Sequence, residues 1–403
     1  MTTQPLTAEH VETTPIPAAR PYNPVTVLAI SFGHLVHDGF GSFLSPLLPL
    51  LIEKLSLSLA LAGSLAAFQS FPSIINPFLG MIGDRFSLRW FAIVAPTATA
   101  TAMCLIGVAP TYILLALLLI VAGVSSACWH TPTPVMVARA GGQRVGFSMS
   151  VLMLGGELAR TIGPLVAVGA VSLWGLEGLW RMIPVGVFAS FVLYWRTKDV
   201  GGRAASAATG GSWAAAWPEL RRVMLPIAGV VATRTFISVC LATYLPILLT
   251  REGSSLLQAG TALSLVMFAG AVGSFTTGTL SDRIGRRRVL LAVLASAPIL
   301  MVLFLSVQGW LLIPILFALG FTALSTSPVL MALVQEYGSS RPATANGLYM
   351  ALEFVGGAVV TITIGVLADA VGLRSAFLIA ALIALGAVPF VLLLPRRATA
   401  PAR

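Results

Sequence analysis

Long runs of apolar residues dominate the chain and recur from about residue 24 to residue 394. Each run is roughly twenty residues or longer, enough for a helix to cross about 30 Å of hydrocarbon. Only 9% of the residues are Asp, Glu, Lys or Arg, against about a quarter in an ordinary soluble domain. So few charges cannot cover a water-facing surface. We therefore expect an all-α integral membrane protein that spans the bilayer many times.

The apolar runs divide into twelve expected transmembrane helices, each bounded by charge, Pro or Gly. They lie near residues 24–51, 58–82, 90–109, 112–136, 144–173, 179–196, 223–249, 256–280, 289–307, 310–335, 343–370 and 375–394. A long stretch rich in Gly, Ala and Ser separates the first six from the last six. The expected organisation is a disordered cytoplasmic tail (1–23), a six-helix bundle (24–196), a cytoplasmic linker (197–222), a second six-helix bundle (223–394) and a cytoplasmic tail (395–403).

Basic residues are distributed unevenly between the two sets of expected loops. The tails and the loops after even-numbered helices carry most of them, and the opposite loops hold only Lys54, Arg181, Arg251 and Arg374. Because basic loops stay in the cytoplasm, both termini are expected there. This topology accounts for the net charge of +10 without a nucleic-acid partner. The three cysteines fall inside apolar runs with no paired spacing, so no metal site and no cofactor is expected.

The two halves share sequence patterns about half a chain length apart. Gly80 with Asp84-Arg85, after the second helix, matches Gly278 with Asp282-Arg283, after the eighth. A Gly-Gly pair at 155–156 in the fifth helix matches another at 356–357 in the eleventh. Two such matches indicate an internal duplication and predict two pseudo-symmetric bundles.

These loops carry a recognisable signature. The pattern Gly-x-x-x-Asp-Arg-x-Gly-Arg-Arg is complete at 278–287, and the first half keeps Gly80, Asp84, Arg85 and Arg89. In this pattern the chain resembles the major facilitator superfamily over about residues 24–394. The resemblance implies a monomeric transporter that works by alternating access. It also implies a gating role for the loop residues Asp84, Arg85, Arg89, Asp282, Arg283 and Arg286.

A narrower resemblance concerns the first half. The run Ser31-Phe-Gly-His34-Leu-Val-His37-Asp38 and the His130-Thr-Pro sequence after the fourth helix are similar to the fosmidomycin-resistance branch of bacterial efflux proteins. Gly163-Pro164 in the fifth helix is similar to the antiporter signature of the superfamily. These similarities imply drug or metabolite efflux across a bacterial plasma (inner) membrane.

Several ionisable residues fall inside the expected helices, where an ionised group costs at least about 2.5 kcal/mol at the bilayer centre and so faces a bundle interior or a wet cavity. His34, His37 and Asp38 share one helical face, which suits proton handling, although a purely structural polar network is the alternative. Glu157 and Arg160 lie one turn apart and either neutralise each other or serve a proton and a substrate.

The second half carries two more intramembrane charges. Arg234, like Arg160, offers a fork of donors to an anionic substrate, and Glu353 is either a proton site or the partner of Arg234. The predicted proton-coupling residues are therefore Asp38, His34, His37, Glu157 and Glu353. The predicted substrate-binding residues are Arg160, Arg234, His130, Tyr244, Tyr349 and Gln69, the last four of which have helix packing as an alternative role.

These features predict a secondary active transporter for a small anionic or amphiphilic organic solute. Proton-coupled efflux by antiport is the favoured mode, and proton-coupled uptake of an organic anion by symport is the alternative. A non-transporting membrane sensor is a third possibility. No nucleotide-binding Gly-x-x-x-x-Gly-Lys-Ser/Thr loop, His-Glu-x-x-His or Gly-x-Ser-x-Gly motif occurs, so an enzyme is not expected. The expected partners are the solute, protons and the lipid bilayer.

Overall fold

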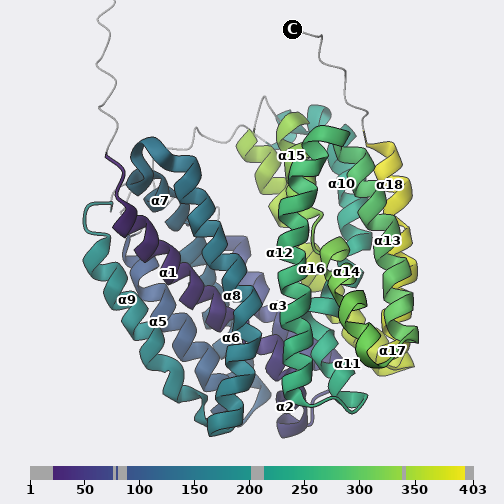
Figure 1. The fold of residues 1–403 in the computed structure, drawn as a ribbon, viewed down its shortest axis with the longest axis horizontal. Coiled ribbons are helices and arrows are strands. Elements are labelled where there is room, and N and C mark those ends of the chain that lie inside the picture. The colour runs from purple at the N-terminus through teal and green to yellow at the C-terminus, as the bar shows by residue number, and fades with distance from the viewer. Residues whose placement is uncertain (1–20, 76–78, 80–88, 201–212, 338–341, 395–403) are drawn as a thin grey trace, which may run out of the picture.

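The computed structural model describes residues 21–75, 79, 89–200, 213–337 and 342–394, and every regular element in these ranges is helical (Figure 1). Ten stretches are long and apolar enough to cross a membrane, and one of them, Tyr112–Trp174, has 63 residues, enough for two crossings. A further apolar helical stretch, Leu59–Ile75, is shorter than these ten. This pattern confirms an all-α membrane fold and is consistent with the twelve expected helices.

Helices of the first half precede residue 200. They are α1 (Pro24–Gly41), α2 (Leu44–Leu55), α3 (Leu59–Ser70), η1 (Phe71–Ile75), α5 (Arg89–Leu105), η2 (Ile106–Val108), α6 (Tyr112–His130), α7 (Thr133–Gly141), η3 (Gly142–Arg144), α8 (Val145–Trp174), η4 (Leu176–Met182) and α9 (Ile183–Arg196). The second half comprises α10 (Trp213–Val239), a π-helical turn (Cys240–Tyr244), α11 (Leu245–Arg251), α12 (Leu256–Ile284), α13 (Arg286–Ser306), α14 (Leu312–Ala323), α15 (Ser327–Tyr337), α16 (Pro342–Val371), α17 (Leu373–Leu385) and α18 (Ala387–Leu393).

Several expected helices are broken in the middle, which the apolar pattern alone does not predict. The first expected helix consists of α1 and α2 with a break at Ser42-Phe43, just before Pro46. The fourth breaks at Thr131-Pro132, and the tenth breaks before Pro328. Proline lacks the amide hydrogen that continues a helix, and its ring clashes with the preceding turn. Each break thus coincides with the residue type that disfavours a continuous helix.

The two halves stand side by side, with the purple-to-teal helices of the first half beside the green-to-yellow helices of the second (Figure 1). They meet where α3 packs on α16 and where α8 packs on α12. We call the side at which α1 begins and α18 ends the Pro24 side, and the side at which α3 begins the Leu59 side. The limits of the two bundles at 24–196 and 223–394 remain a proposal.

A carboxylate of one half caps a helix of the other on the Leu59 side. Asp369, near the end of α16, accepts hydrogen bonds from the backbone amides of Leu59 and Ala60, each at 2.8 Å. These amides belong to the first turn of α3, where backbone donors lack partners within the helix and the helix dipole favours negative charge. The cap therefore stabilises closure of the halves on this side.

Close backbone approach strengthens the same contact. Tyr244 is fully buried, and its hydroxyl donates to the carbonyl oxygen of Thr361 at 2.7 Å and lies 3.4 Å from that of Leu59. A Cβ atom added to Gly63 would lie 2.2 Å from the Tyr244 hydroxyl and 2.7 Å from the backbone carbonyl oxygen of Thr361 in α16. Only glycine allows α3 and α16 to approach so closely at this point.

We expect Asp369→Ala to open the Leu59 side. Loss of a helix-capping acceptor costs about 1 kcal/mol, which corresponds to a roughly fivefold larger fraction of open molecules. Spin labels at Glu53 and Ser254, one on each half, in a chain without its native cysteines, report the distance by double electron–electron resonance. Glu177→Ala is the matched control, because Glu177 pairs with Lys54 inside the first half. Identical distance distributions for Asp369→Ala and the parent would show that the cap does not hold the halves together.

Candidate functional site

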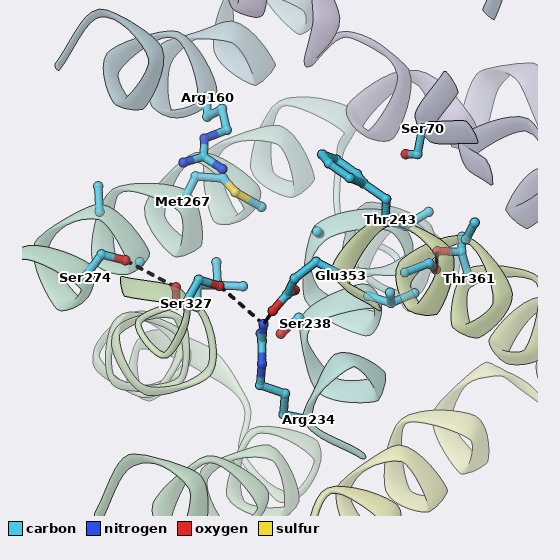
Figure 2. A pocket seen from close by; sticks show the side chains of 18 of the residues that line it. Ser70, Arg160, Arg234, Ser238, Thr243, Met267, Ser274, Ser327, Glu353 and Thr361 are labelled. Carbon is cyan, nitrogen blue, oxygen red and sulfur yellow. Dashed lines mark hydrogen bonds and ion pairs between the residues drawn. The ribbon is translucent and has the colours of Figure 1, made fainter. Parts of the chain in front are cut away.

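A cavity of about 350 Å³ lies between the two halves (Figure 2). Its wall includes Ser70 of α3 and Glu157 and Arg160 of α8 from the first half. The second half contributes residues of α10, α12, α15 and α16, among them Arg234, Ser238, Met267, Ser274, Ser327 and Glu353. We call this cavity the central pocket. It gathers four of the ionisable residues that the sequence places inside helices.

Arg234 and Glu353 form an ion pair across the pocket wall, between α10 and α16 (Figure 2). The Arg234 side chain is only 6% exposed, and its guanidinium also donates to the Ser327 hydroxyl at 3.2 Å. The Glu353 side chain is 23% exposed and faces the pocket. A buried cation without a partner would be very costly, so Glu353 is the group that allows Arg234 to stay charged in this position.

A second ion pair lies on α8. Arg160 donates to the carboxylate of Glu157, one turn earlier on the same helix. Both side chains are far more accessible than Arg234, with Arg160 55% exposed. The guanidinium of Arg160 lies across the pocket from Arg234 and Glu353 (Figure 2). The two pairs therefore present charge to the pocket from both halves.

A separate cluster, which we call the Asp38 cluster, consists of Asp38, His34, His37 and His130. The nearest side-chain separations from the Asp38 carboxylate are 3.2 Å to His34 Nε2, 3.4 Å to His130 Nε2 and 3.9 Å to His37 Nε2. The structure thus brings His130, at the end of α6, beside the three residues of α1. None of the four is among the residues that line the central pocket.

Hydrogen bonds to Nδ1 fix two rings of the Asp38 cluster, those of His34 and His37. His34 Nδ1 lies 2.7 Å from the carbonyl oxygen of Leu152, which can only accept, so this nitrogen carries a hydrogen. His37 Nδ1 lies 3.1 Å from the Thr99 hydroxyl, which itself donates to Ser125. The Thr99 oxygen therefore accepts from His37. In the neutral rings, both Nε2 atoms are then left with a lone pair.

Three other predicted substrate-binding residues also lie outside the lining of the pocket. Gln69 donates to the carbonyl oxygen of Gly41 at 2.6 Å and joins α3 to α1. Tyr244 belongs to the contact between the halves described above. Tyr349 is buried, and its hydroxyl donates to the carbonyl oxygen of Ser327 at 3.4 Å, next to Arg234. Their positions favour packing, and a substrate role for them stays untested.

The structure describes four of the six predicted gating residues. Asp84 and Arg85 lie outside the described residues, and Arg283 is exposed. Arg286, the first residue of α13, forms ion pairs with Asp282 at the end of α12, at 2.7 Å, and with Glu336 of α15, at 2.9 Å, so it joins three helices of the second half. Arg89 donates to the Thr197 hydroxyl at 3.1 Å and to the Tyr194 carbonyl oxygen at the end of α9. The gating role itself stays a prediction.

Sequence reasoning missed several residues that the structure makes important. Asp369 is near a helix end and carries no signal that it caps α3. Thr99 and Ser125 are ordinary small polar residues in apolar helices, and Ser327 and Glu336 acquire their roles only through partners far away in the chain. Only the contacts in three dimensions identify them.

Similarity to known proteins agrees with this architecture. A sequence profile of the family described as Major Facilitator Superfamily matches residues 30–361 and 227–403, which together span most of the chain. The chain belongs to the Major Facilitator Superfamily. It is therefore a multi-pass membrane protein of a family of transporters.

Individual relatives are distant but match over nearly their full length. The chain is 25% identical to the MFS-type transporter YfnC of Bacillus subtilis over 91% of this chain and 92% of that protein. It is 22% identical to the fosmidomycin resistance protein of Escherichia coli over 89% of each chain. Among solved structures, a bacterial homologue of the human lysosomal transporter Spinster, inward-facing and unoccupied, superposes with a TM-score of 0.77 at 15% identity over 92% of this chain and 96% of that chain.

We expect the two members of the buried pair to differ in their effect on stability. Glu353→Gln leaves the buried Arg234 cation without a counter-charge and should cost about 3 kcal/mol. Arg234→Gln leaves Glu353, which is partly exposed and can take up a proton, and should cost less. Thermal unfolding in detergent measures the stability of both single variants and of the double variant. The loss of stability in the double variant should be smaller than the sum of the two single losses.

Glu157→Gln serves as the control, because an accessible pair contributes at most about 1 kcal/mol. Equal losses for Glu353→Gln and Arg234→Gln, with an additive double variant, would mean that the pair does not stabilise the fold in the way described.

Proposed function

We propose that the chain is a proton-coupled secondary transporter that exports a small amphiphilic organic solute through the central pocket by alternating access. The observation that carries this proposal is the pocket itself, which is bounded by both halves and contains ionisable side chains from each. Such a site changes its exposure when the halves rock against each other. Charged side chains inside a membrane protein carry a high free-energy cost, so their presence in the wall of the pocket favours a functional role.

The lining of the pocket supports an amphiphilic solute. Apolar side chains such as Val239, Met267, Leu324 and Phe354 share the wall with the two Arg–Glu pairs. An apolar body would contact the first group, and a charged or polar end would contact the second. Arg160, the more accessible guanidinium, is the proposed contact for an anionic group. Arg234 is held by Glu353 and Ser327 and is less available.

Glu353 is the proposed coupling group. It combines a carboxylate, access to the pocket and a partner, Arg234, whose interaction with it disappears when the carboxylate takes up a proton. A solute that offers Glu353 a cationic or strongly donating group competes with the proton, which gives antiport. Glu157 is accessible and paired on its own helix. The predicted proton role of His34, His37 and Asp38 has less support, because these residues lie outside the pocket.

The same ion pair favours a second candidate function, proton-coupled uptake of an organic anion. An anion that binds Arg234 must displace Glu353, and the released carboxylate then takes up a proton more readily. Anion and proton would bind together, which gives symport. The chemistry of the solute at Glu353 and Arg234 therefore decides between the two modes.

The proposed orientation places the Pro24 side in the cytoplasm of a bacterial cell. It rests on the basic residues of the loops and tails on that side. Closure of the halves at Asp369 and Leu59 would then leave the central pocket facing inward, as expected for loading an exported solute. A monomer suffices for this mechanism, since both walls of the pocket come from one chain.

Transport by purified protein in proteoliposomes tests the mode. Fosmidomycin is the first probe, because one relative is named for resistance to it. Antiport predicts accumulation of the probe in vesicles with an acidic interior, where protons leave as the probe enters. Accumulation only in vesicles with an alkaline interior would replace antiport by symport. If neither this probe nor a panel of organic anions and amphiphiles moved, the transport proposal would be withdrawn in favour of a sensor.

We expect Glu353→Gln to separate coupling from translocation. The variant cannot exchange a proton at this position, so a pH gradient should no longer drive accumulation, whereas exchange of labelled for unlabelled probe should continue. Glu157→Gln is the matched control and should keep at least half of the gradient-driven accumulation. Full gradient-driven accumulation by Glu353→Gln would remove Glu353 from the coupling mechanism.

A further inference from the structure

Two imidazoles and one carboxylate of the Asp38 cluster converge on a single point within the first half. His34 and Asp38 come from α1, and His130 comes from the last turn of α6. We propose that His34, Asp38 and His130 bind one divalent transition-metal ion that accepts mixed nitrogen and oxygen ligands, such as Zn²⁺ or Co²⁺. The site is independent of the central pocket and of the proposed transport reaction.

The separations between the three ligand atoms suit one ion. They all lie within 4.8 Å of one another, with 3.2 Å from His34 Nε2 to Asp38 Oδ2 and 3.4 Å from His130 Nε2 to Asp38 Oδ1. Ligands bound to zinc at about 2.1 Å in a tetrahedron are about 3.4 Å apart. The side chains therefore need only small adjustments to surround an ion.

The hydrogen-bonding state of His34 gives the second, independent observation. Its Nδ1–H donates to the Leu152 carbonyl oxygen, and its buried Nε2 has no neighbour within hydrogen-bonding distance other than Asp38 Oδ2 at 3.2 Å. In the neutral ring, Nε2 is an acceptor that faces another acceptor, the Asp38 carboxylate. A cation between the two removes this conflict. Histidines that bind metals characteristically donate their other ring N–H to a backbone carbonyl or a carboxylate, as His34 does.

Neighbouring residues hold the ligands in place before any ion arrives. A Cβ atom on Gly156 would lie 2.6 Å from His34 Cε1, so the backbone of α8 lies directly against the ring. His37 stacks on Trp129 with ring centroids 5.3 Å apart and lies beside Asp38. The ring of His37 is fixed in turn by Thr99. A rigid surrounding of this kind lowers the cost of ordering the ligands.

The site is open on one side. The His130 side chain is 43% exposed, against 19% for Asp38 and 8% for His34, so His130 is the most accessible of the three ligands. Three protein ligands leave a fourth position of a tetrahedral ion for water or another small ligand. A bound ion would also join α1 to the end of α6. The site therefore resembles an accessible, exchangeable metal site more than a closed structural one.

Metal binding by the full-length protein in detergent, with any histidine tag removed, tests the proposal. Co²⁺ is the spectroscopic probe, and Zn²⁺ is titrated by calorimetry. We expect one ion per chain and visible absorption bands typical of four-coordinate Co²⁺, which Zn²⁺ abolishes. His130→Asn is the most informative variant, because this residue is accessible and its replacement leaves the buried ligands in place. It should weaken binding at least about tenfold, and Asp38→Asn should do the same.

Glu177→Gln is the control, since it changes an exposed carboxylate of the first half that lies outside both the Asp38 cluster and the central pocket, and it should bind the metal like the parent. The absence of saturable one-to-one binding, or parent-like affinity of His130→Asn in a folded protein, would overturn the proposal. The measurement needs no transported solute. Failure of metal binding would therefore leave the transport proposal intact, and failure of transport would leave the metal site intact.

Discussion

The high cost of an unpaired charge in hydrocarbon determines where the ionisable side chains of this fold lie. Arg234 is paired with Glu353 and Arg160 with Glu157, and the Asp38 carboxylate lies within 3.9 Å of three imidazoles. Each of these interactions joins residues of one half, and the two Arg–Glu pairs line the pocket between the halves. The ion pairs lower the free-energy cost of placing these charges in a membrane protein. In the proposals above, they are also the contacts that a solute or a metal ion would rearrange.

The contact between the halves combines strong shape constraints with weak polar ones. The close approach of α3 to α16 at Gly63 fixes how the halves meet, and the Asp369 cap adds about 1 kcal/mol. A contribution of this size favours the closed arrangement of the Leu59 side without preventing the open one. Since the pocket pairs lie further toward the Pro24 side, opening the Leu59 side need not break them. Closure and solute binding can therefore be separated energetically.

The sequence predicts those parts of this structure that depend on local chemistry. Apolar runs indicate the helices, and spacing along one helix indicates that Glu157 can meet Arg160 and that His34 can meet Asp38. Contacts between distant segments are different, because no local pattern encodes them. The sequence leaves the pairing of Arg234 with Glu353 as one of two alternatives, suggests a substrate role for His130 and not a contact with Asp38, and gives no sign of the Asp369 cap. Proline breaks were also missed, because hydropathy does not register the lost backbone amide.

The location of each ionisable centre relative to the moving parts distinguishes their roles. Glu353 lies on α16, which packs on α3 of the other half, so rocking of the halves changes its surroundings. The Asp38 cluster draws its residues from α1 and α6, with Leu152 of α8 behind His34, all within the first half. If that half moves as a unit, the distances inside the cluster do not change during the cycle. The proposed coupling role of Glu353 needs alternating exposure, which its helix beside the contact between the halves would supply, whereas a fixed set of ligands suits the proposed metal ion.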